Sequence, residues 1–267
     1  MDPISRTSAA EALLEANRSG VSIPPLRETY PDLTIEDAYE IQMLTVRSWL
    51  AAGRTVGGYK VGLTSPAMQK QLGVAQPDFG HIFTDQFYLE NMPMDLSGHI
   101  LPRVEPEIAF VLKEDLCGPG VTVVDAIRAV DYVLPALEVV DSRVRDWDIQ
   151  IGDTVADNAS GGGVVLGSTP TYLGDADLRL VGCTMYKNGQ VAGTGAGGAV
   201  LGSPINALVW LANTVGPLGT VLEAGKVVLP GSVTKMVPVA PGDRVTANFG
   251  SGLGSVTALI ATTSKEN

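Results

Sequence analysis

The pattern of apolar and polar positions changes near Val56, and the two parts of the chain predict different secondary structure. Before Val56, apolar residues recur at helical spacing. After it, short β-like runs are separated by glycine, proline and aspartate, as is typical of strands joined by tight turns. We predict an α+β fold with a small helical N-terminal subdomain over residues 1–55 and a β-rich domain, a mixed β-barrel or sandwich, over residues 56–267.

Helix-capping patterns mark two helices in the first part. Ser8 and Glu11 have the spacing of a capping box, and Gly20 is a plausible end for that helix. Thr34 and Asp37 form a second box in front of an apolar stripe. We expect one helix to begin at each box.

Two helices also interrupt the β-rich part. The segments 122–131 and 203–215 have helical character, and Thr122 is positioned to cap the first of them. Ser203 followed by Pro204 is a favourable start for the second, because proline is well accepted at the first helical position. We expect these helices to pack outside the β-rich core.

Charge and hydropathy exclude several classes of protein. The 267 residues include 18 basic and 29 acidic side chains, and the net charge of -11 disfavours binding to nucleic acid or to anionic membranes. No apolar run approaches the roughly 20 residues that span a bilayer, and the first residues lack the pattern of a signal peptide. We therefore expect a soluble, cytoplasmic protein.

The scarcity of cysteine and histidine limits the metal chemistry. Cys117 and Cys183 form no C-x-x-C pair and no disulfide framework, and His81 and His99 are the only histidines. A zinc site with several histidines is thus excluded. Any metal in this protein must be held mainly by oxygen.

Glu105 and Glu107 are the first candidates for such ligands. In a strand they project from one face, while Ile108 and the alternate apolar residues after it project from the other. Pro106 lies between them and cannot donate a ladder hydrogen bond, which predicts a position near a strand start or edge. For the pair alone, we favour the simpler interpretation of a solvated strand face at that edge.

Glu138 adds a third carboxylate, within an apolar run. A buried lone glutamate would be protonated or paired with a cation such as Arg143 or Arg145. Alternatively it completes a three-carboxylate site with Glu105 and Glu107, suited to a hard cation such as Mg²⁺ or Mn²⁺ that also binds a chelating 2-oxo acid. Spacing alone does not separate these two interpretations.

Lys60 and Asp78 have both structural and functional interpretations. Lys60 lies in a strand-like run among glycines, where it is either solvated or donates to a substrate carboxylate or transfers a proton. Asp78 is either a turn residue or an acid or base on a loop over a pocket. The polar segment 153–160 suggests a region fixed by hydrogen bonds near the site, but Ser160 is no nucleophile because G-x-S-x-G is absent. The glycine-rich stretch 193–198 suggests a flexible loop at the edge of a site and not a nucleotide loop.

Several of these segments together resemble one family over nearly the whole chain. The chain is similar to the 2-hydroxypenta-2,4-dienoate hydratases (2-keto-4-pentenoate hydratases) of the fumarylacetoacetate hydrolase-like superfamily. The matching segments occur in the same order: Pro24–Arg27, Lys60–Ser65, Gln76–Gly80, Arg103–Ile108, Leu134–Val139, Asp141–Arg143, Arg145–Trp147 and Asp153–Ser160. So many ordered matches make the resemblance specific.

The resemblance implies roles for the candidate residues. It implies that Glu105, Glu107 and Glu138 bind Mg²⁺ or Mn²⁺, that Lys60 and Asp78 act in substrate binding and proton transfer, and that residues 56–267 form the catalytic domain. Ser160 is then expected to contribute to substrate binding. The implied assembly is a homo-oligomer, pentameric or decameric, and the implied partner is a small 2-oxo or 2-hydroxy acid.

The implied reaction is addition of water to 2-hydroxypenta-2,4-dienoate, or a close relative, to give a 4-hydroxy-2-oxo acid. The main rival is 4-oxalocrotonate decarboxylase, which is similar in fold, metal ligands and lysine; Asp78 in Pro77-Asp78-Phe79-Gly80 favours the hydratase. A C–C hydrolase of the superfamily is disfavoured because neither histidine matches the expected water-activating residue. A catalytically silent, metal-stabilised subunit is a further alternative, disfavoured because the candidate residues are all present.

Overall fold

The structure is a computed structural model that describes residues 1–65, 69–70 and 76–262. Its helices are α1 (Pro3–Ser19), α2 (Leu26–Thr29), α3 (Ile35–Ala51), α5 (Val123–Ala129), α6 (Ile151–Ala156) and α7 (Pro204–Val215), and a short 3₁₀ turn, η3, spans Asn158–Ser160. Its strands are β1 (Val56–Gly62), β2 (Asp78–Phe83), β3 (Phe87–Leu89), β4 (Pro93–Met94), β5 (Arg103–Leu112), β6 (Val130–Val140), β7 (Gly161–Leu166), β8 (Gly182–Lys187), β9 (Gln190–Ala196), β10 (Val227–Leu229), β11 (Val237–Pro238), β12 (Arg244–Phe249) and β13 (Gly254–Ile260).

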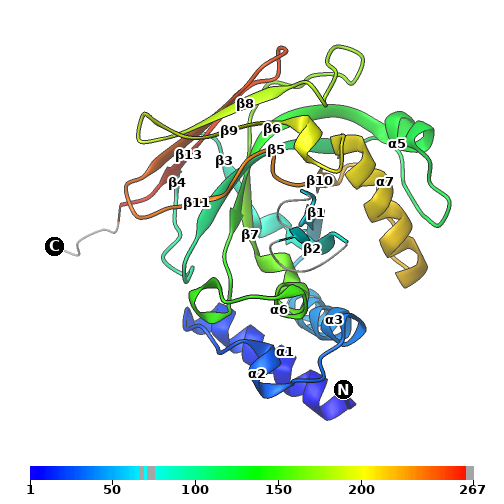
Figure 1. The fold of residues 1–267 in the computed structure, drawn as a ribbon, viewed down its shortest axis with the longest axis vertical. Coiled ribbons are helices and arrows are strands. Elements are labelled where there is room, and N and C mark those ends of the chain that lie inside the picture. The colour runs from blue at the N-terminus through cyan, green and yellow to red at the C-terminus, as the bar shows by residue number, and fades with distance from the viewer. Residues whose placement is uncertain (66–68, 71–75, 263–267) are drawn as a thin grey trace.

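Across the described residues, the strands form two mixed sheets that curl around a shared core (Figure 1). The larger sheet has the order β2-β1-β10-β5-β6-β7-β3, with β11 also pairing with β5. The smaller sheet has the order β4-β13-β12-β8-β9. The predicted α+β class with a mixed β-rich core is confirmed.

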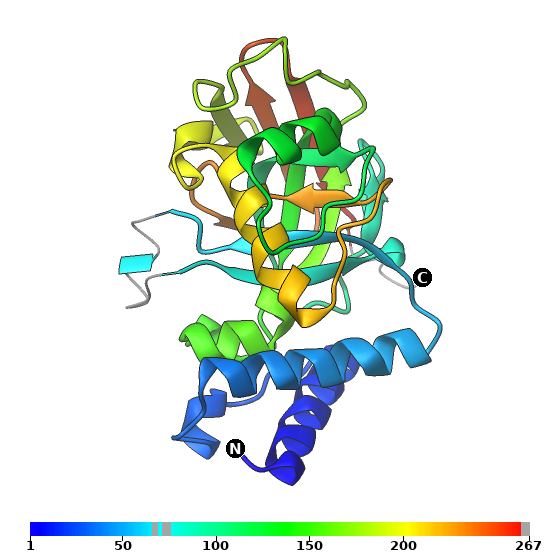
Figure 2. The same ribbon diagram turned by 90° about the vertical axis from the view of Figure 1, so that its right-hand side faces the viewer.

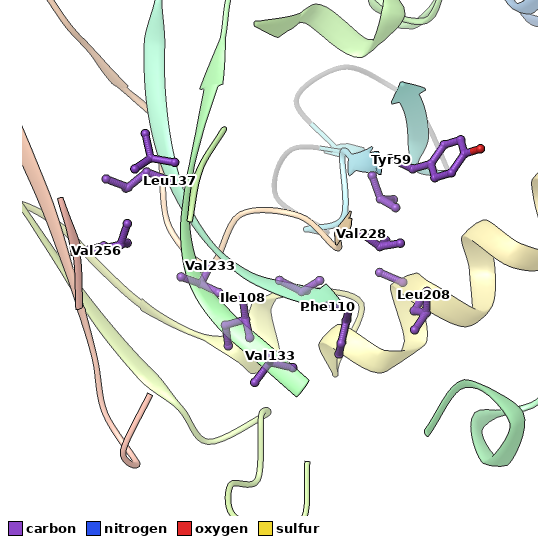
Figure 3. Close-up of a cluster of buried hydrophobic side chains, with 14 of the residues drawn as sticks. Tyr59, Ile108, Phe110, Val133, Leu137, Leu208, Val228, Val233 and Val256 are labelled. Carbon is purple, nitrogen blue, oxygen red and sulfur yellow. The ribbon is translucent and has the colours of Figure 1, made fainter. Parts of the chain in front are cut away.

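Apolar residues from both sheets and from α7 form the main core. In Figure 3, Leu137 of β6 faces Val256 of β13, so the two sheets pack against each other there. Leu208 of α7 lies beside Phe110 and Val228 on the larger sheet. All five side chains are buried, and their packing stabilises the central strands β5 and β6. The candidate metal ligands lie on these two strands.

Helices α1, α2 and α3 lie together at one end of the molecule, beneath the larger sheet (Figures 1 and 2). Their apolar faces form a second buried cluster that includes Leu13 of α1, Ile41 of α3 and, from much later in the chain, Val155 and Ala156 of α6. The helices therefore bury their apolar face partly against α6.

The capping patterns predicted one of these two helix starts correctly. Thr34 and Asp37 form the expected reciprocal capping box at the start of α3. The box predicted at Ser8 is wrong, because α1 begins at Pro3 and its N-cap is Asp2. An aspartate followed by proline is a strong helix start, and it lies six residues earlier, so Ser8 is inside the helix.

The predicted helices in the β-rich part are present. Thr122 caps α5 through a reciprocal box, and α7 begins at Pro204 after Ser203. By length and composition alone, the described segment Gly197–Leu218 could cross a membrane, with mean hydropathy 1.2. Its α7 portion instead packs against the core through buried residues such as Leu211, and a core helix passes the same test.

The glycine-rich stretch 193–198 is not the flexible loop that the sequence suggests. Its first part belongs to the edge strand β9, in which Gly193 and Gly195 pair with β8. A Cβ at Gly195 would lie 1.8 Å from the backbone oxygen of Val233. The glycines are therefore explained by close approach of another chain segment.

Candidate metal and substrate site

Glu105, Glu107 and Glu138 come together in the middle of the larger sheet. One carboxylate oxygen from each lies within 4.8 Å of the others. With metal–oxygen bonds of about 2.1–2.4 Å, two oxygens on opposite sides of one ion are about 4.2–4.8 Å apart. The spacing of the three carboxylates thus suits a single divalent cation.

The strand register explains why these three residues converge. Glu105 of β5 pairs directly with Glu138 of β6, and Glu107 follows two residues later on the same face. Pro106 is not at an edge, since β5 lies between β10 and β6. The Pro106 carbonyl accepts a hydrogen bond from the Val233 amide, on the side of β5 where the gap between β10 and β11 lies. The N–H that proline lacks would lie on that same side, so no hydrogen bond to β6 is lost.

The fit of a cation can be tested on the carboxylate oxygens themselves. The Gly231 amide donates to Glu107 Oε2 at 2.7 Å. Within the described part of the chain, Glu107 Oε1 and Glu138 Oε2 are buried without a hydrogen-bond partner. Buried carboxylate oxygens are costly without a partner, and oxygen ligands are those that Mg²⁺ and Mn²⁺ prefer. The three residues fit a divalent cation.

Electrostatics in this cluster also favour a cation. Burial raises the pKa of Glu105 to about 8, and the charge of Glu138 adds to this rise. Burial raises the pKa of Glu107 well above its usual range, with further increases from Glu138 and Glu105. Burial also raises the pKa of Glu138, although Lys60 opposes it. A divalent cation would compensate this repulsion.

Lys60 of β1 lies at the side of the cluster. Its ammonium is 3.4 Å from Glu138 Oε1 and donates to the Ala159 carbonyl at 2.9 Å. Burial disfavours the charged form, but Glu138, Asp78 and the two other glutamates outweigh it and raise the pKa of Lys60 above its ordinary value. Lys60 is therefore a buried cation. It occupies the place beside Glu138 that one of the two sequence interpretations gave to Arg143 or Arg145, and Arg143 instead pairs with Asp157.

Asp78 begins β2, beside Lys60, and is not a solvated turn residue. The register pairs Asp78 with Gly62, where an added Cβ would lie 2.2 Å from Asp78 Oδ1 and 3.4 Å from Lys60 Nζ. Burial raises the pKa of Asp78, and Lys60 and the Thr154 hydroxyl oppose this rise. The absence of a side chain at Gly62 gives Asp78 and Lys60 room to lie near each other.

The polar segment 153–160 is fixed by hydrogen bonds, as its composition predicts. Arg143 binds Asp157 through its Nε and donates to the Asp157 carbonyl at 2.6 Å. Ser160 Oγ donates to Asp157 Oδ2 at 3.2 Å, and the Asn158 amide nitrogen donates to the His81 carbonyl at 2.9 Å. These bonds hold η3, whose Ala159 carbonyl receives Lys60, against the site.

Sequence reasoning missed three contributors to this site. Gly231 binds Glu107 through its backbone, Ala159 binds Lys60 through its carbonyl, and Thr154 binds Asp78 Oδ2 through its hydroxyl at 3.1 Å. Backbone donors and acceptors leave no residue-type signal. Thr154 and Ala159 both lie within the matched segment 153–160, which was the one available indication.

The fold and the three-carboxylate site define the class to which this chain belongs. Residues 61–261 match the family described as fumarylacetoacetate (FAA) hydrolase C-terminal. In structure, the chain is similar to 4-oxalocrotonate decarboxylase from Pseudomonas putida G7, solved with magnesium and adipate, with a TM-score of 0.93, 37% identity and coverage of 97% of this chain and 98% of that chain.

Sequence relatives specify the family further. The chain is 48% identical over 256 residues to a 2-keto-4-pentenoate hydratase from Paraburkholderia xenovorans, covering 96% of this chain and 95% of the relative. It is 47% identical over 236 residues to a 2-hydroxyhexa-2,4-dienoate hydratase from Comamonas testosteroni, covering 88% and 89%. The chain belongs to the 2-keto-4-pentenoate hydratase family of the fumarylacetoacetate hydrolase superfamily.

Proposed function

We propose that this protein is a hydro-lyase that adds water to 2-hydroxypenta-2,4-dienoate, or a close 2-hydroxy-2,4-dienoate, to give a 4-hydroxy-2-oxo acid. The observation that carries the proposal is the location of Asp78 and Lys60 beside Glu105, Glu107 and Glu138 in one buried site. The similarity of this chain to the two hydratases supports the same reaction class.

The reaction needs two proton movements and one addition of water. The dienol first loses its 2-hydroxyl proton and gains one at C5, forming a 2-oxo-3-enoate whose C4 is electrophilic. Hydroxide from water then bonds to C4, and C3 gains a proton. The enzyme therefore needs groups that exchange protons with the substrate near its carboxylate end and near its tail.

Glu105, Glu107 and Glu138 would hold a divalent cation, for which we propose Mg²⁺ or Mn²⁺. When bound, this cation would polarise the substrate 2-oxo group and stabilise negative charge on its oxygen. Lys60 has three N–H donors, and among the described residues it directs two of them to Ala159 and Glu138, so that one can meet a substrate carboxylate or enol oxygen.

We assign proton transfer near the substrate tail to Asp78, with Lys60 as the second candidate. Burial raises the pKa of Asp78, which favours a carboxyl that holds a proton and can release it. Ser160 remains a proposed substrate contact. Because its hydroxyl donates to Asp157, it offers the substrate its oxygen lone pairs in this arrangement.

The second candidate function is decarboxylation of a 2-oxo-3-enedioate, favoured by similarity to the Pseudomonas putida G7 decarboxylase. Asp78 argues against it, since this carboxyl group, once it has released its proton, would repel the neighbouring carboxylate that is to be lost. Ultraviolet absorbance of the dienol, followed with and without Mg²⁺ or Mn²⁺, tests the hydratase. The expected product is heavier than the substrate by one water, whereas release of carbon dioxide from 2-oxo-3-hexenedioate would favour the decarboxylase.

The metal assignment has a separate test. Glu138→Gln should abolish metal-dependent turnover and weaken Mn²⁺ binding, measured by titration calorimetry, while the far-ultraviolet circular dichroism stays native. Wild-type Mn²⁺ affinity in this variant would remove Glu138 from the metal site. A catalytically silent subunit would instead bind Mn²⁺ normally and turn over neither substrate.

We further propose that the protein is soluble and cytoplasmic and assembles as a homo-oligomer, pentameric or decameric. The acidic net charge of -11 and the small-molecule chemistry of the site support a soluble enzyme without a nucleic-acid partner. Sedimentation velocity measures the assembly directly, and a monomer would contradict this part of the proposal.

A further inference from the structure

The two carboxyl oxygens of Asp78 have different environments. Thr154 Oγ1 donates to Asp78 Oδ2 at 3.1 Å, and both side chains are buried. Asp78 Oδ1 is buried without a hydrogen-bond partner among the described residues, on the side of Gly62 and Lys60. One oxygen is thus held by a protein donor, while the other is free to meet a substrate.

A second contact holds together the two segments that carry this hydrogen bond. Gln42 of α3 donates from Nε2 to the carbonyl of Phe79 at 2.9 Å and to the carbonyl of Val155 at 2.8 Å. Phe79 follows Asp78 in the chain, and Val155 follows Thr154. The buried Gln42 amide therefore fixes the separation between β2 and α6 immediately beside the Thr154–Asp78 bond.

Helix α6 is also anchored from the N-terminal helices. Arg27 of α2 forms an ion pair of 2.6 Å with Asp153, which is buried, and donates to the Asp148 carbonyl at 2.8 Å. Residues 1–60 lie outside the match to the superfamily model, which begins at residue 61. Contacts from outside that match thus set the position of Thr154.

We propose that Thr154 is the positioning residue of this enzyme: it holds Asp78 Oδ2, so that Oδ1 is the oxygen that exchanges a proton with the substrate. Gln42 and the Arg27–Asp153 ion pair keep Thr154 in place. This inference rests on the proposed role of Asp78 in hydration. It predicts that the Thr154 hydroxyl contributes to turnover without touching the substrate.

A carboxyl group held at one oxygen has a restricted rotation about its Cβ–Cγ bond. Loss of the threonine donor allows the group to rotate and to place Oδ1 away from its productive position. Misplacement of a reacting group by about 1 Å can reduce a rate about 100-fold, whereas substrate binding by other residues is unaffected. The effect should therefore fall on kcat and not on KM.

The test compares Thr154→Val, which keeps the shape and removes the hydroxyl, with Thr154→Ser, which keeps the hydroxyl. Thr154→Val should lower kcat for hydration by roughly 10- to 100-fold with little change in KM. Thr154→Ser should recover most of the lost rate. Equal rates in Thr154→Val and the wild type, or equal losses in both variants, would overturn the proposal.

Thr45→Val is the matched control. Thr45 is also a buried threonine, but its hydroxyl donates to the Ile41 carbonyl within α3, at 3.3 Å. This variant should lose a comparable amount of thermal stability while its kcat remains that of the wild type. A loss of kcat as large as that of Thr154→Val would mean that general destabilisation explains the effect.

A readout without turnover separates this inference from the proposed function. The Asp78 carboxyl is followed by ¹³C NMR in aspartate-labelled protein, with Asp78→Asn identifying its signal. Thr154→Val should raise the pKa of Asp78, because it removes a donor to the carboxylate form, and Mn²⁺ affinity should not change. If the wild type fails to hydrate the dienoate but this shift occurs, the function is wrong and the positioning stands; an unchanged Asp78 titration overturns the positioning.

Discussion

Gly231 contributes to the candidate metal site through its backbone alone. It has a φ of +118°, and an added Cβ would lie 2.0 Å from Thr64 Oγ1, so alanine there is both strained and sterically blocked. Because the Gly231 amide orients Glu107, Gly231→Ala should weaken Mn²⁺ binding by roughly 10- to 100-fold, measured by titration calorimetry.

Gly225→Ala separates strain from ligand orientation. Gly225 also has a positive φ, of +81°, but an added Cβ would meet open space. This variant should lose stability in a thermal melt and retain the Mn²⁺ affinity of the wild type. Equal affinities in the two alanine variants would show that the Gly231 contact has no influence on the metal.

His81 should make the protein less stable in acid. Burial lowers the pKa of His81 to about 4, whereas an unfolded histidine titrates near its ordinary value of 6.5. Below pH 6.5 the unfolded chain thus binds a proton at His81, whereas the folded protein does not bind one until the pH is near 4. The free energy of unfolding therefore decreases as the pH falls from 6.5 toward 4. One pKa unit corresponds to about 1.4 kcal/mol, so the loss between pH 7 and pH 5 is about 2 kcal/mol.

His81→Phe tests this linkage. The side chain packs near Tyr59 and Phe79, which a phenyl ring can also contact. Urea denaturation at pH 7 and pH 5 should show a smaller decrease in unfolding free energy for the variant than for the wild type. The same decrease in both proteins would place the acid sensitivity elsewhere.

Alternation within a strand was enough to place Glu105 and Glu107 on one face, and the structure agrees. Their convergence with Glu138 depends on the register of β5 with β6, which spacing alone did not determine; the family resemblance supplied it. The link between Thr154 and Asp78 joins residues 76 positions apart, and no local pattern encodes it. Local sequence thus predicts which residues can act, and tertiary contacts determine their partners.

Helix starts offer a direct comparison of a confirmed cap with a rejected one. Thr34→Ala removes the side chain that accepts from the Asp37 amide at the start of α3, and should lower the unfolding free energy by about 1 kcal/mol. Ser8 is exposed inside α1, where alanine is the better helix former, so Ser8→Ala should be neutral or stabilising by up to about 0.5 kcal/mol.

Chemical denaturation of the two variants beside the wild type distinguishes the caps. A larger loss for Ser8→Ala than for Thr34→Ala would restore the sequence interpretation of α1. The sequence was misleading here because Ser8 and Glu11 have the spacing of a box wherever they occur. They have no capping role here because α1 already begins at Pro3, after its N-cap Asp2.

The left-handed turn η3 is an element that no propensity argument predicted. Asn158, Ala159 and Ser160 have φ values of 53°, 50° and 52°, a conformation that residues other than glycine rarely adopt in succession. The surrounding hydrogen bonds of Asn158 and Ser160 hold it, and Ala159 presents its carbonyl to Lys60. Backbone strain of this kind is characteristic of functional sites.

The predicted boundary between the helical N-terminal subdomain and the β-rich domain, at residues 55 and 56, raises the question of whether the two parts unfold separately. Helices α1 to α3 share their buried cluster with α6, and Gln42 binds both β2 and α6. Because each part leaves apolar and polar groups uncovered without the other, we expect them to unfold together. A composition change along a chain marks a change of secondary structure, and by itself it does not mark an independent folding unit.

Tryptophan fluorescence can measure this coupling, because Trp49 lies in α3 and Trp210 lies in α7. In a Trp147→Phe background, a second replacement by phenylalanine leaves either Trp49 or Trp210 as the sole reporter. Both reporters should give the same denaturation midpoint and the same slope once each variant is referenced to its own circular dichroism transition. An earlier transition at Trp49 would show that the helices unfold first, as a subdomain with its own stability, and that α6 and Thr154 lose their N-terminal support before the β-rich core unfolds.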